Sequence, residues 1–179
     1  TMRNCIRNKK VLILGFGREG KSTYKLIEKA GGYERLAIAD LNPITDTLAE
    51  NVLIITGEDY QKSLNDYDVV FKSPGIVLEQ EIGTYTCEIV SQTELFFRRF
   101  RNQIIGITGT KGKTTTSFLM KSILEKAGMK TGLIGTTGNM IGEKRLPGTM
   151  TTPDPEYFMG AIAEMRRLGC EVLIYEASS

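Results

Sequence analysis

Short apolar runs alternate with amphipathic stretches along almost the whole chain of 179 residues. The apolar runs have the length of buried strands, and helical spacing of apolar residues follows most of them. Strands that alternate with helices in this way predict parallel sheets and the α/β class. We expect strands at 10–14, 36–39, 52–55, 68–71, 103–107, 131–134 and 171–175, and helices at about 21–30, 93–101, 115–127 and after Pro155.

The pattern divides near Asn102, where a short helix ends and a new strand begins. We expect a Rossmann-like parallel-sheet domain at 1–102 and the first part of a second α/β domain at 103–179. The basic N-terminus is expected to lead straight into the first strand. A loop or hairpin is expected to run through Pro147. In the helix at 115–127, apolar residues recur with helical spacing, which predicts that they face the core. These residues are Met120, Ile123, Leu124 and Ala127.

Composition narrows the function classes. The formal net charge is +2 with dispersed positive residues, so nothing favours general nucleic-acid binding. No apolar run approaches the ~20 residues of a membrane span. Cys5, Cys87 and Cys170 are far apart, which indicates reduced thiols and a cytoplasmic protein. The chain contains no histidine, so it cannot itself supply a histidine-based triad or metal site.

A glycine-rich loop carries the clearest chemistry. The sequence GITGTKGKTTT (106–116) joins the strand expected at 103–107 to the next helix. Backbone amides of such a loop and the helix N-terminus bind nucleotide phosphates. Lys113 would reach the β- and γ-phosphates, and the Thr114 hydroxyl would bind Mg²⁺. The alternative is an ordinary glycine-rich turn. The spacing differs from the common phosphate loop, because Ile107 stands where that pattern has glycine.

Two further patterns lie at the carboxyl ends of expected strands, where open α/β sheets bind ligands. Glycines at 15, 17 and 20 form G-x-G-x-x-G, and Asp40 ends the second strand. Alone, this pattern suggests NAD, but it also serves any Rossmann-like sheet as a packing device. Glu176 ends the last strand. It is either an acid that binds magnesium or an ordinary solvent-exposed glutamate at a strand end. Thr151 and Thr152 precede a helix, where a simple N-cap is as good a reading.

The loop GITGTKGKTTT resembles the ATP loop of the Mur ligase family, the ligases that add amino acids to UDP-N-acetylmuramic acid; folylpolyglutamate synthetases share it. The motifs GFGREGKS, Asp40 and SPGI resemble the D-glutamate-adding members, whose first domain binds UDP rather than a nicotinamide. The motifs TKGKTTT, LIGTTGN, TMTTPDP and YEASS resemble the third-step members that add diaminopimelate or lysine. The chain is therefore similar to a divergent D-glutamate ligase or to two joined segments.

The resemblance implies an ATP-dependent amide ligase that uses ATP and Mg²⁺. Its substrates would be UDP-N-acetylmuramoyl-L-alanine, activated as an acyl phosphate, and D-glutamate; addition of diaminopimelate or lysine at the third step is the alternative. Lys113 and Glu176 would be catalytic, and Thr114 and Glu176 would hold the metal. The ATP loop would comprise Gly109, Thr110, Lys111, Gly112, Lys113, Thr114 and Thr115. The UDP-substrate would contact Gly15, Gly17, Arg18, Glu19, Gly20, Asp40, Ser73, Pro74, Gly75, Thr136, Thr151, Thr152 and Ser178.

Family members continue beyond the residues matched here, with the rest of the ATP domain and an amino-acid domain. We therefore expect this chain alone to be inactive as a ligase. Two other functions stay open from the residues themselves. One is a nicotinamide-binding protein, from GFGREG and Asp40, and the other is a phosphate-loop NTPase that acts as a switch. A guanine-reading Asn-Lys-x-Asp is absent from the sequence.

Overall fold

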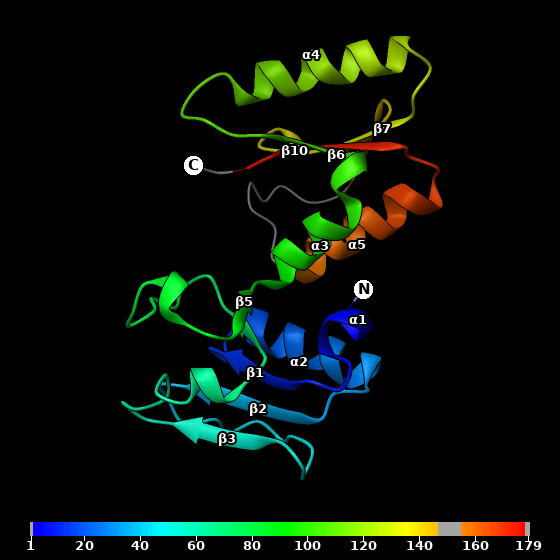
Figure 1. Cartoon of the computed structure of the whole chain (residues 1–179). Coiled ribbons are helices and arrows are strands. Elements are labelled where there is room, and N and C mark those ends of the chain that lie inside the picture. Colours follow the sequence, from blue (N-terminus) through cyan, green and yellow to red (C-terminus); the bar gives the residue numbers. More distant parts are fainter. Residues whose placement is uncertain (1, 147–154, 178–179) are drawn as a thin grey trace. The chain divides into compact units, whose positions relative to one another are not determined.

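A computed structural model describes residues 2–146 and 155–177 of the chain. The chain forms two compact units, Thr1–Arg99 and Phe100–Ser179 (Figure 1). Each unit is built around its own sheet, in agreement with the predicted α/β class. The assignment of 1–102 to UDP binding and of 103–179 to ATP binding concerns function and stays a prediction.

The first unit has a five-stranded sheet in the order β3-β2-β1-β4-β5, and every neighbouring pair is parallel. Its strands are β1 (Lys10–Leu14), β2 (Arg35–Asp40), β3 (Leu53–Thr56), β4 (Val69–Lys72) and β5 (Glu88–Val90). Its helices are α1 (Met2–Ile6), α2 (Arg18–Ala30) and α3 (Gln92–Phe100), with short 3₁₀ turns at Leu64–Asp66 and Ile82–Thr84; a third 3₁₀ turn, Arg101–Gln103, follows α3 in the second unit.

Successive side chains of β1 enter two different hydrophobic clusters, because side chains alternate across a strand. Val11 and Ile13 pack with Ile27 of α2, while Leu12 and Leu14 pack with Leu64 and its neighbours. Both faces of the strand are therefore buried. This explains why the sequence of β1 is continuously apolar, as is typical of a central parallel strand.

The strand order reverses between β1 and β4, so this sheet has a topological switch point. The turns after these two strands meet at the carboxyl ends, which is the edge where open α/β sheets bind ligands. The sequence elements at this edge are Gly15–Gly20 after β1 and Ser73–Gly75 after β4. The fold thus brings two of the predicted substrate motifs to one edge.

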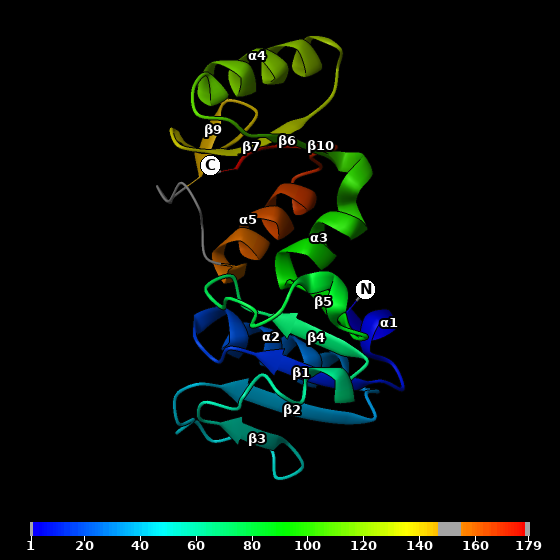
Figure 2. The ribbon, with the colours of Figure 1, turned by 60° about the vertical axis from the view of Figure 1, so that its left-hand side comes forward.

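The second unit has a sheet in the order β6-β10-β7-β8-β9, and the views in Figures 1 and 2 show α4 and α5 on its opposite faces. Its first three strands are parallel, and β8 and β9 add an antiparallel hairpin. The strands are β6 (Ile104–Ile107), β7 (Thr131–Gly135), β8 (Gly138–Ile141), β9 (Lys144–Leu146) and β10 (Val172–Glu176); the helices are α4 (Lys113–Lys126) and α5 (Pro155–Arg167).

Two sequence expectations about the elements were wrong. The N-terminus forms helix α1 before the first strand, and Ile6 of that helix is fully buried. Five residues are too short for a helical period to be visible, so tertiary packing decides this segment. The strand β5 was also missed, because its three residues include only two apolar ones.

The face that α4 turns inward also differs from the expectation. Ile123 is 53% exposed and Ala127 is exposed, whereas Ser117 and Lys121 are buried. Polar bonds set this orientation: Ser117 bonds to Glu176, and Lys121 pairs with Glu125, which accepts a hydrogen bond from Thr131 of β7. The apolar spacing of α4 is real, but part of its apolar side lies at the surface.

None of the helices within residues 2–146 and 155–177 is long and apolar enough to cross a membrane.

Candidate functional site

The glycine-rich loop leads from β6 into α4, as the sequence predicts. Gly109 and Gly112 both have positive φ, 132° and 80°, a conformation that glycine adopts without steric cost. Gly112 is the N-cap of α4, and Lys113 is its first residue. The Lys113 ammonium folds back over the loop and donates a hydrogen bond to the Gly109 carbonyl. The loop therefore closes around the position where a phosphate would meet the helix N-terminus.

Glu176 lies at the end of β10, directly beside this loop. The parallel register pairs Glu176 with Ile107, the last residue of β6, so both elements end at the same edge. Glu176 is only 1% exposed. Its Oε1 accepts a 2.5 Å hydrogen bond from the Ser117 hydroxyl. Its Oε2 accepts hydrogen bonds from the hydroxyls of Thr136 (2.9 Å) and Thr114 (3.2 Å).

The charge of Glu176 is stabilised by these donors. Burial opposes the charged form, but the hydrogen bonds from Ser117, Thr136 and Thr114 outweigh it and hold the pKa below its ordinary value. A buried carboxylate that stays charged, with a threonine hydroxyl 3.2 Å away, suits a hard divalent cation such as Mg²⁺, which prefers oxygen ligands. The predicted metal pair, Thr114 and Glu176, is thus close enough to share one ion.

This lowered pKa gives a pH prediction. Because the folded-state pKa of Glu176 lies below the ordinary 4.5, its contribution to stability is present above about pH 4.5 and is lost as the pH falls through the folded-state pKa. We expect the amides of β10 to lose hydrogen-exchange protection in this acidic range, after correction for intrinsic rates. Glu176→Gln should remove this part of the pH dependence. The exposed Glu143→Gln of the same unit should keep it, and an equal loss in both variants would contradict the assignment.

In the first unit, Gly15 is held from several sides at the switch point. The Ser73 hydroxyl donates a 3.0 Å hydrogen bond to the Gly15 carbonyl, and the Gly15 amide donates to Ala39. The Lys72 ammonium caps the turn that follows β4, through the carbonyls of Ser73 (3.1 Å) and Ile76 (2.7 Å). The turns after β1 and β4 therefore support each other, and no sequence pattern predicts the part that Lys72 plays.

Asp40 braces the same region from the end of β2. Its Oδ2 accepts a 2.6 Å hydrogen bond from the Phe16 amide, and its Oδ1 accepts one of 2.8 Å from the Asn42 amide. The neighbouring Leu41 is 52% exposed. The carboxylate of Asp40 thus already has two backbone donors, which fixes the position of the loop after β1.

Glu19 and Arg18 begin helix α2, immediately after the glycine loop. Burial raises the pKa of Glu19, and the nearby Lys72 charge only partly opposes this shift. The Glu19 Oε1 is buried and has no hydrogen-bond partner among the described residues.

The three glycines of this loop have different surroundings, which gives a matched pair of variants. A Cβ on Gly20 would collide with the Gly15 carbonyl oxygen, whereas a Cβ on Gly17 would meet nothing within 4 Å. We expect Gly20→Ala to destabilise the first unit by about 1–3 kcal/mol in urea unfolding, because a backbone atom cannot move aside cheaply. Gly17→Ala should leave that free energy nearly unchanged. Equal stabilities of the two variants would contradict the close packing of α2 on β1.

The other predicted site residues fall into two groups. Thr110 and Lys111 lie in the loop before Gly112, and Thr115 lies in the first turn of α4. Thr151, Thr152 and Ser178 lie outside the described residues. Ser117 was missed, because a serine in the second turn of a helix has no motif of its own. Its contact with Glu176 depends on the sheet register that brings β10 beside β6.

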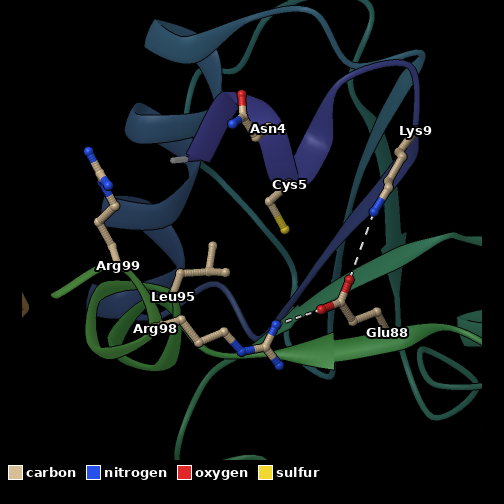
Figure 3. Close-up of a pocket in the computed structure, with 7 residues that line it drawn as sticks. All are labelled: Asn4, Cys5, Lys9, Glu88, Leu95, Arg98 and Arg99. Carbon is tan, nitrogen blue, oxygen red and sulfur yellow. Dashed lines mark hydrogen bonds and ion pairs between the residues drawn. The ribbon is translucent and has the colours of Figure 1, made fainter. Parts of the chain in front are cut away.

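A hollow of about 430 Å³ lies in the first unit and contains none of the predicted site residues. Figure 3 shows Cys5 of α1 pointing into it, with Leu95 and Arg98 of α3 opposite. Glu88 bridges Lys9 (3.8 Å) and Arg98 (2.7 Å) at its rim. Burial raises the pKa of the Cys5 thiol, which disfavours the reactive thiolate. Paired charges and a thiol with a raised pKa thus line this hollow.

No cluster of three or more histidine, cysteine, aspartate or glutamate side chains that could hold a metal exists among residues 2–146 and 155–177. Any cation at Glu176 would therefore need hydroxyl, water or phosphate oxygens to complete its ligands. The threonines around Glu176 supply such oxygens.

Known proteins resemble the chain in both units. Residues 107–179 match the Mur ligase middle domain. A UDP-N-acetylmuramoyl-L-alanyl-D-glutamate--2,6-diaminopimelate ligase of Clostridium perfringens is 51% identical over 77 residues, which is 43% of this chain and 16% of the relative. A UDP-N-acetylmuramoylalanine--D-glutamate ligase of Alkaliphilus metalliredigens is 33% identical over 158 residues, 80% of this chain and 34% of the relative. The chain thus spans about a third of that relative's length.

A solved UDP-N-acetylmuramoyl-L-alanyl-D-glutamate--2,6-diaminopimelate ligase aligns with 98% of this chain and 30% of its own, with 18% identity and a TM-score of 0.45. The sequence matches include both kinds of ligase that the motifs resemble. The phosphate loop and strand β10, which ends beside it, both lie inside the matched middle domain. The chain belongs to the Mur ligase family.

Proposed function

We propose that the chain is the substrate-binding unit and the first part of the ATP-binding unit of an ATP-dependent ligase in peptidoglycan precursor synthesis. The observation that carries this proposal is the position of Glu176 beside the loop that bears Lys113 and Thr114. A phosphate loop next to a charged strand-end acid is the arrangement that phosphoryl transfer requires. The family membership supplies the substrate class, a UDP-N-acetylmuramoyl-peptide, and the cytoplasm is where such a soluble ligase would act.

The reaction step that we propose is addition of D-glutamate to UDP-N-acetylmuramoyl-L-alanine. The D-glutamate ligase match extends over 80% of the chain, whereas the diaminopimelate ligase match extends over 43%. Breadth of similarity favours the former, because a substrate-binding unit as well as an ATP loop must match. The higher identity of the shorter match, 51%, keeps the third step, with diaminopimelate or lysine, as the second candidate.

In the proposed mechanism, the terminal carboxylate of the UDP-substrate attacks the γ-phosphorus of ATP and releases ADP. The resulting acyl phosphate is attacked by the amine of the incoming amino acid, which expels phosphate and forms the amide. Lys113 would leave the Gly109 carbonyl and neutralise the transferring phosphoryl group. Thr114 and Glu176 would hold Mg²⁺, which when bound stabilises charge on the β- and γ-phosphates. The residues of the first unit would bind and orient the UDP-substrate.

The switch point between β1 and β4 has two candidate ligands, and titration separates them. We expect calorimetry to detect binding of UDP and of UDP-N-acetylmuramoyl-L-alanine, and no binding of NADH. Asp40→Ala should weaken UDP binding, because the Phe16 amide loses its partner and the loop loosens. The same variant should leave ATP affinity unchanged. Binding of NADH without UDP would instead support the nicotinamide-binding alternative.

The reaction itself is tested in a complete ligase that contains this chain. Phosphate release should require both UDP-N-acetylmuramoyl-L-alanine and D-glutamate. A requirement for the D-glutamyl extension and diaminopimelate or lysine would move the protein to the third step. The 179-residue chain alone is expected to form no amide, since it covers about a third of the D-glutamate ligase length.

A further inference from the structure

Three oxygen atoms from three different segments lie together at the edge of the second sheet. They are Oγ1 of Thr114 on α4, Oγ1 of Thr136 after β7 and Oε2 of Glu176 on β10. The two hydroxyl oxygens are 2.9 Å apart. The distances from Oε2 are 2.9 Å to Thr136 and 3.2 Å to Thr114. The three atoms thus form a nearly equilateral triangle.

This triangle has the size of one face of an octahedral magnesium site. Mg²⁺ binds oxygen at about 2.1 Å in near-ideal octahedral geometry, so two adjacent ligands lie about 3.0 Å apart. All three edges here are within 0.2 Å of about that value, since they measure 2.9, 2.9 and 3.2 Å. Hydrogen bonding explains each edge singly, but a cation explains why one carboxylate oxygen and two hydroxyl oxygens converge on one another.

The opposite side of the carboxylate is closed, which leaves Oε2 as the oxygen that a cation can reach. Oε1 accepts the hydrogen bond of Ser117, which is fully buried. Thr136, by contrast, is exposed, and its amide also points at Oε2, at 3.3 Å. An ion that approaches Glu176 from solvent therefore meets the Thr136 hydroxyl on its way.

The position of Thr136 is fixed by the sheet. It directly follows β7, whose residues Gly132 to Ile134 pair with Leu173 to Tyr175 of β10. The contact between Thr136 and Glu176 does not depend on a long loop, because Thr136 directly follows β7 and Glu176 is the last residue of β10. The hydroxyl of Thr136 is thus held near the carboxylate by the strands of the sheet, as a pre-organised metal ligand should be.

We propose that Thr136 is a third protein ligand of the divalent cation, together with Thr114 and Glu176. The site would take a hard, oxygen-preferring cation, Mg²⁺ or Mn²⁺, with phosphate oxygens and water on the opposite face of the octahedron. The proposal rests on the proposed ATP-binding function of this unit and assigns Thr136 to the cation rather than to the UDP-substrate.

The test uses Mn²⁺ with a non-hydrolysable ATP analogue and the 179-residue chain. Thr136→Val removes the hydroxyl but keeps the shape, Thr136→Ser keeps the hydroxyl, and Thr137→Val is the matched control at the next exposed position. We expect Thr136→Val to weaken Mn²⁺ binding in the ternary complex about tenfold, as the loss of one oxygen ligand, while the other two variants stay within about twofold of wild type.

The number of water molecules on the bound Mn²⁺ separates a ligand from a mere positioning residue. Electron paramagnetic resonance in ¹⁷O-enriched water should count one more bound water in Thr136→Val than in wild type, since water replaces the hydroxyl. An unchanged water count would overturn the proposal, whatever the affinity. The ligase proposal is tested separately, by the UDP titrations and by phosphate release. Its failure can therefore be told apart from a failure of the Thr136 proposal.

Discussion

Replacement of Lys113 by alanine should lower the affinity of the chain for MgATP about tenfold to a hundredfold. The ammonium is the charged donor at the start of α4, and a hydrogen bond to a charged group contributes about 1.5–3 kcal/mol. In a complete ligase the same change should abolish acyl-phosphate formation, because the charge on the transferring group is then not neutralised. Calorimetry with MgATP, and phosphate release in the complete enzyme, measure the two effects.

Lys126→Ala is the matched control, because Lys126 is an exposed lysine in the last turn of the same helix. It should bind MgATP like wild type. UDP binding should be unaffected by either change, because its determinants lie in the first unit. Phosphate release at the wild-type rate from Lys113→Ala would refute the role of the loop lysine.

Replacement of Gly135 by alanine should have a comparably large effect on cation binding, although Gly135 contacts no nucleotide in the proposed function. A Cβ on Gly135 would lie 2.6 Å from both Cδ and Oε1 of Glu176, so the carboxylate must turn away from Ser117 and Thr136. The carboxyl group ends a flexible side chain and can move, so the fold is kept while the cation site is lost. We expect nucleotide-dependent Mn²⁺ binding to fall at least about tenfold, as for loss of a metal ligand.

Gly132→Ala in the same strand is the control for this variant. Its Cβ would meet the Sδ of Met165 at 2.5 Å, which is an equally tight contact on the other side of the sheet. Methionine is flexible and adapts to such changes, so Gly132→Ala should alter stability but not Mn²⁺ binding. If Gly135→Ala bound Mn²⁺ like wild type, Glu176 would not be a ligand.

Most of the strands and helices of this chain could be predicted from the sequence, because each of these carries a local signal. The continuous apolar run of β1 is an example, and its residues Val11 to Leu14 are all fully buried. Helix α1 and the inward face of α4 could not be predicted. Their structure is decided by contacts with distant segments, such as Ser117 with Glu176, rather than by local spacing.

The candidate site shows the same division. The loop of Lys113 and the strand-end Glu176 could be found, because the phosphate loop has a fixed spacing and strand ends have a known place in α/β sheets. The contact of Thr136 with both Thr114 and Glu176 depends on strand order and register, which place β10 between β6 and β7. No one-dimensional pattern contains that information.

The braced turns of the first unit have a kinetic consequence. Asp40, Ser73 and Lys72 hold the turns after β1 and β4 by hydrogen bonds within the protein itself. A ligand that binds at this edge of the sheet does not have to order the backbone of these turns, so little conformational entropy is lost at the moment of association. Stopped-flow traces of UDP binding should therefore be single exponentials whose rate rises linearly with ligand concentration, without the plateau that a preceding closure step imposes.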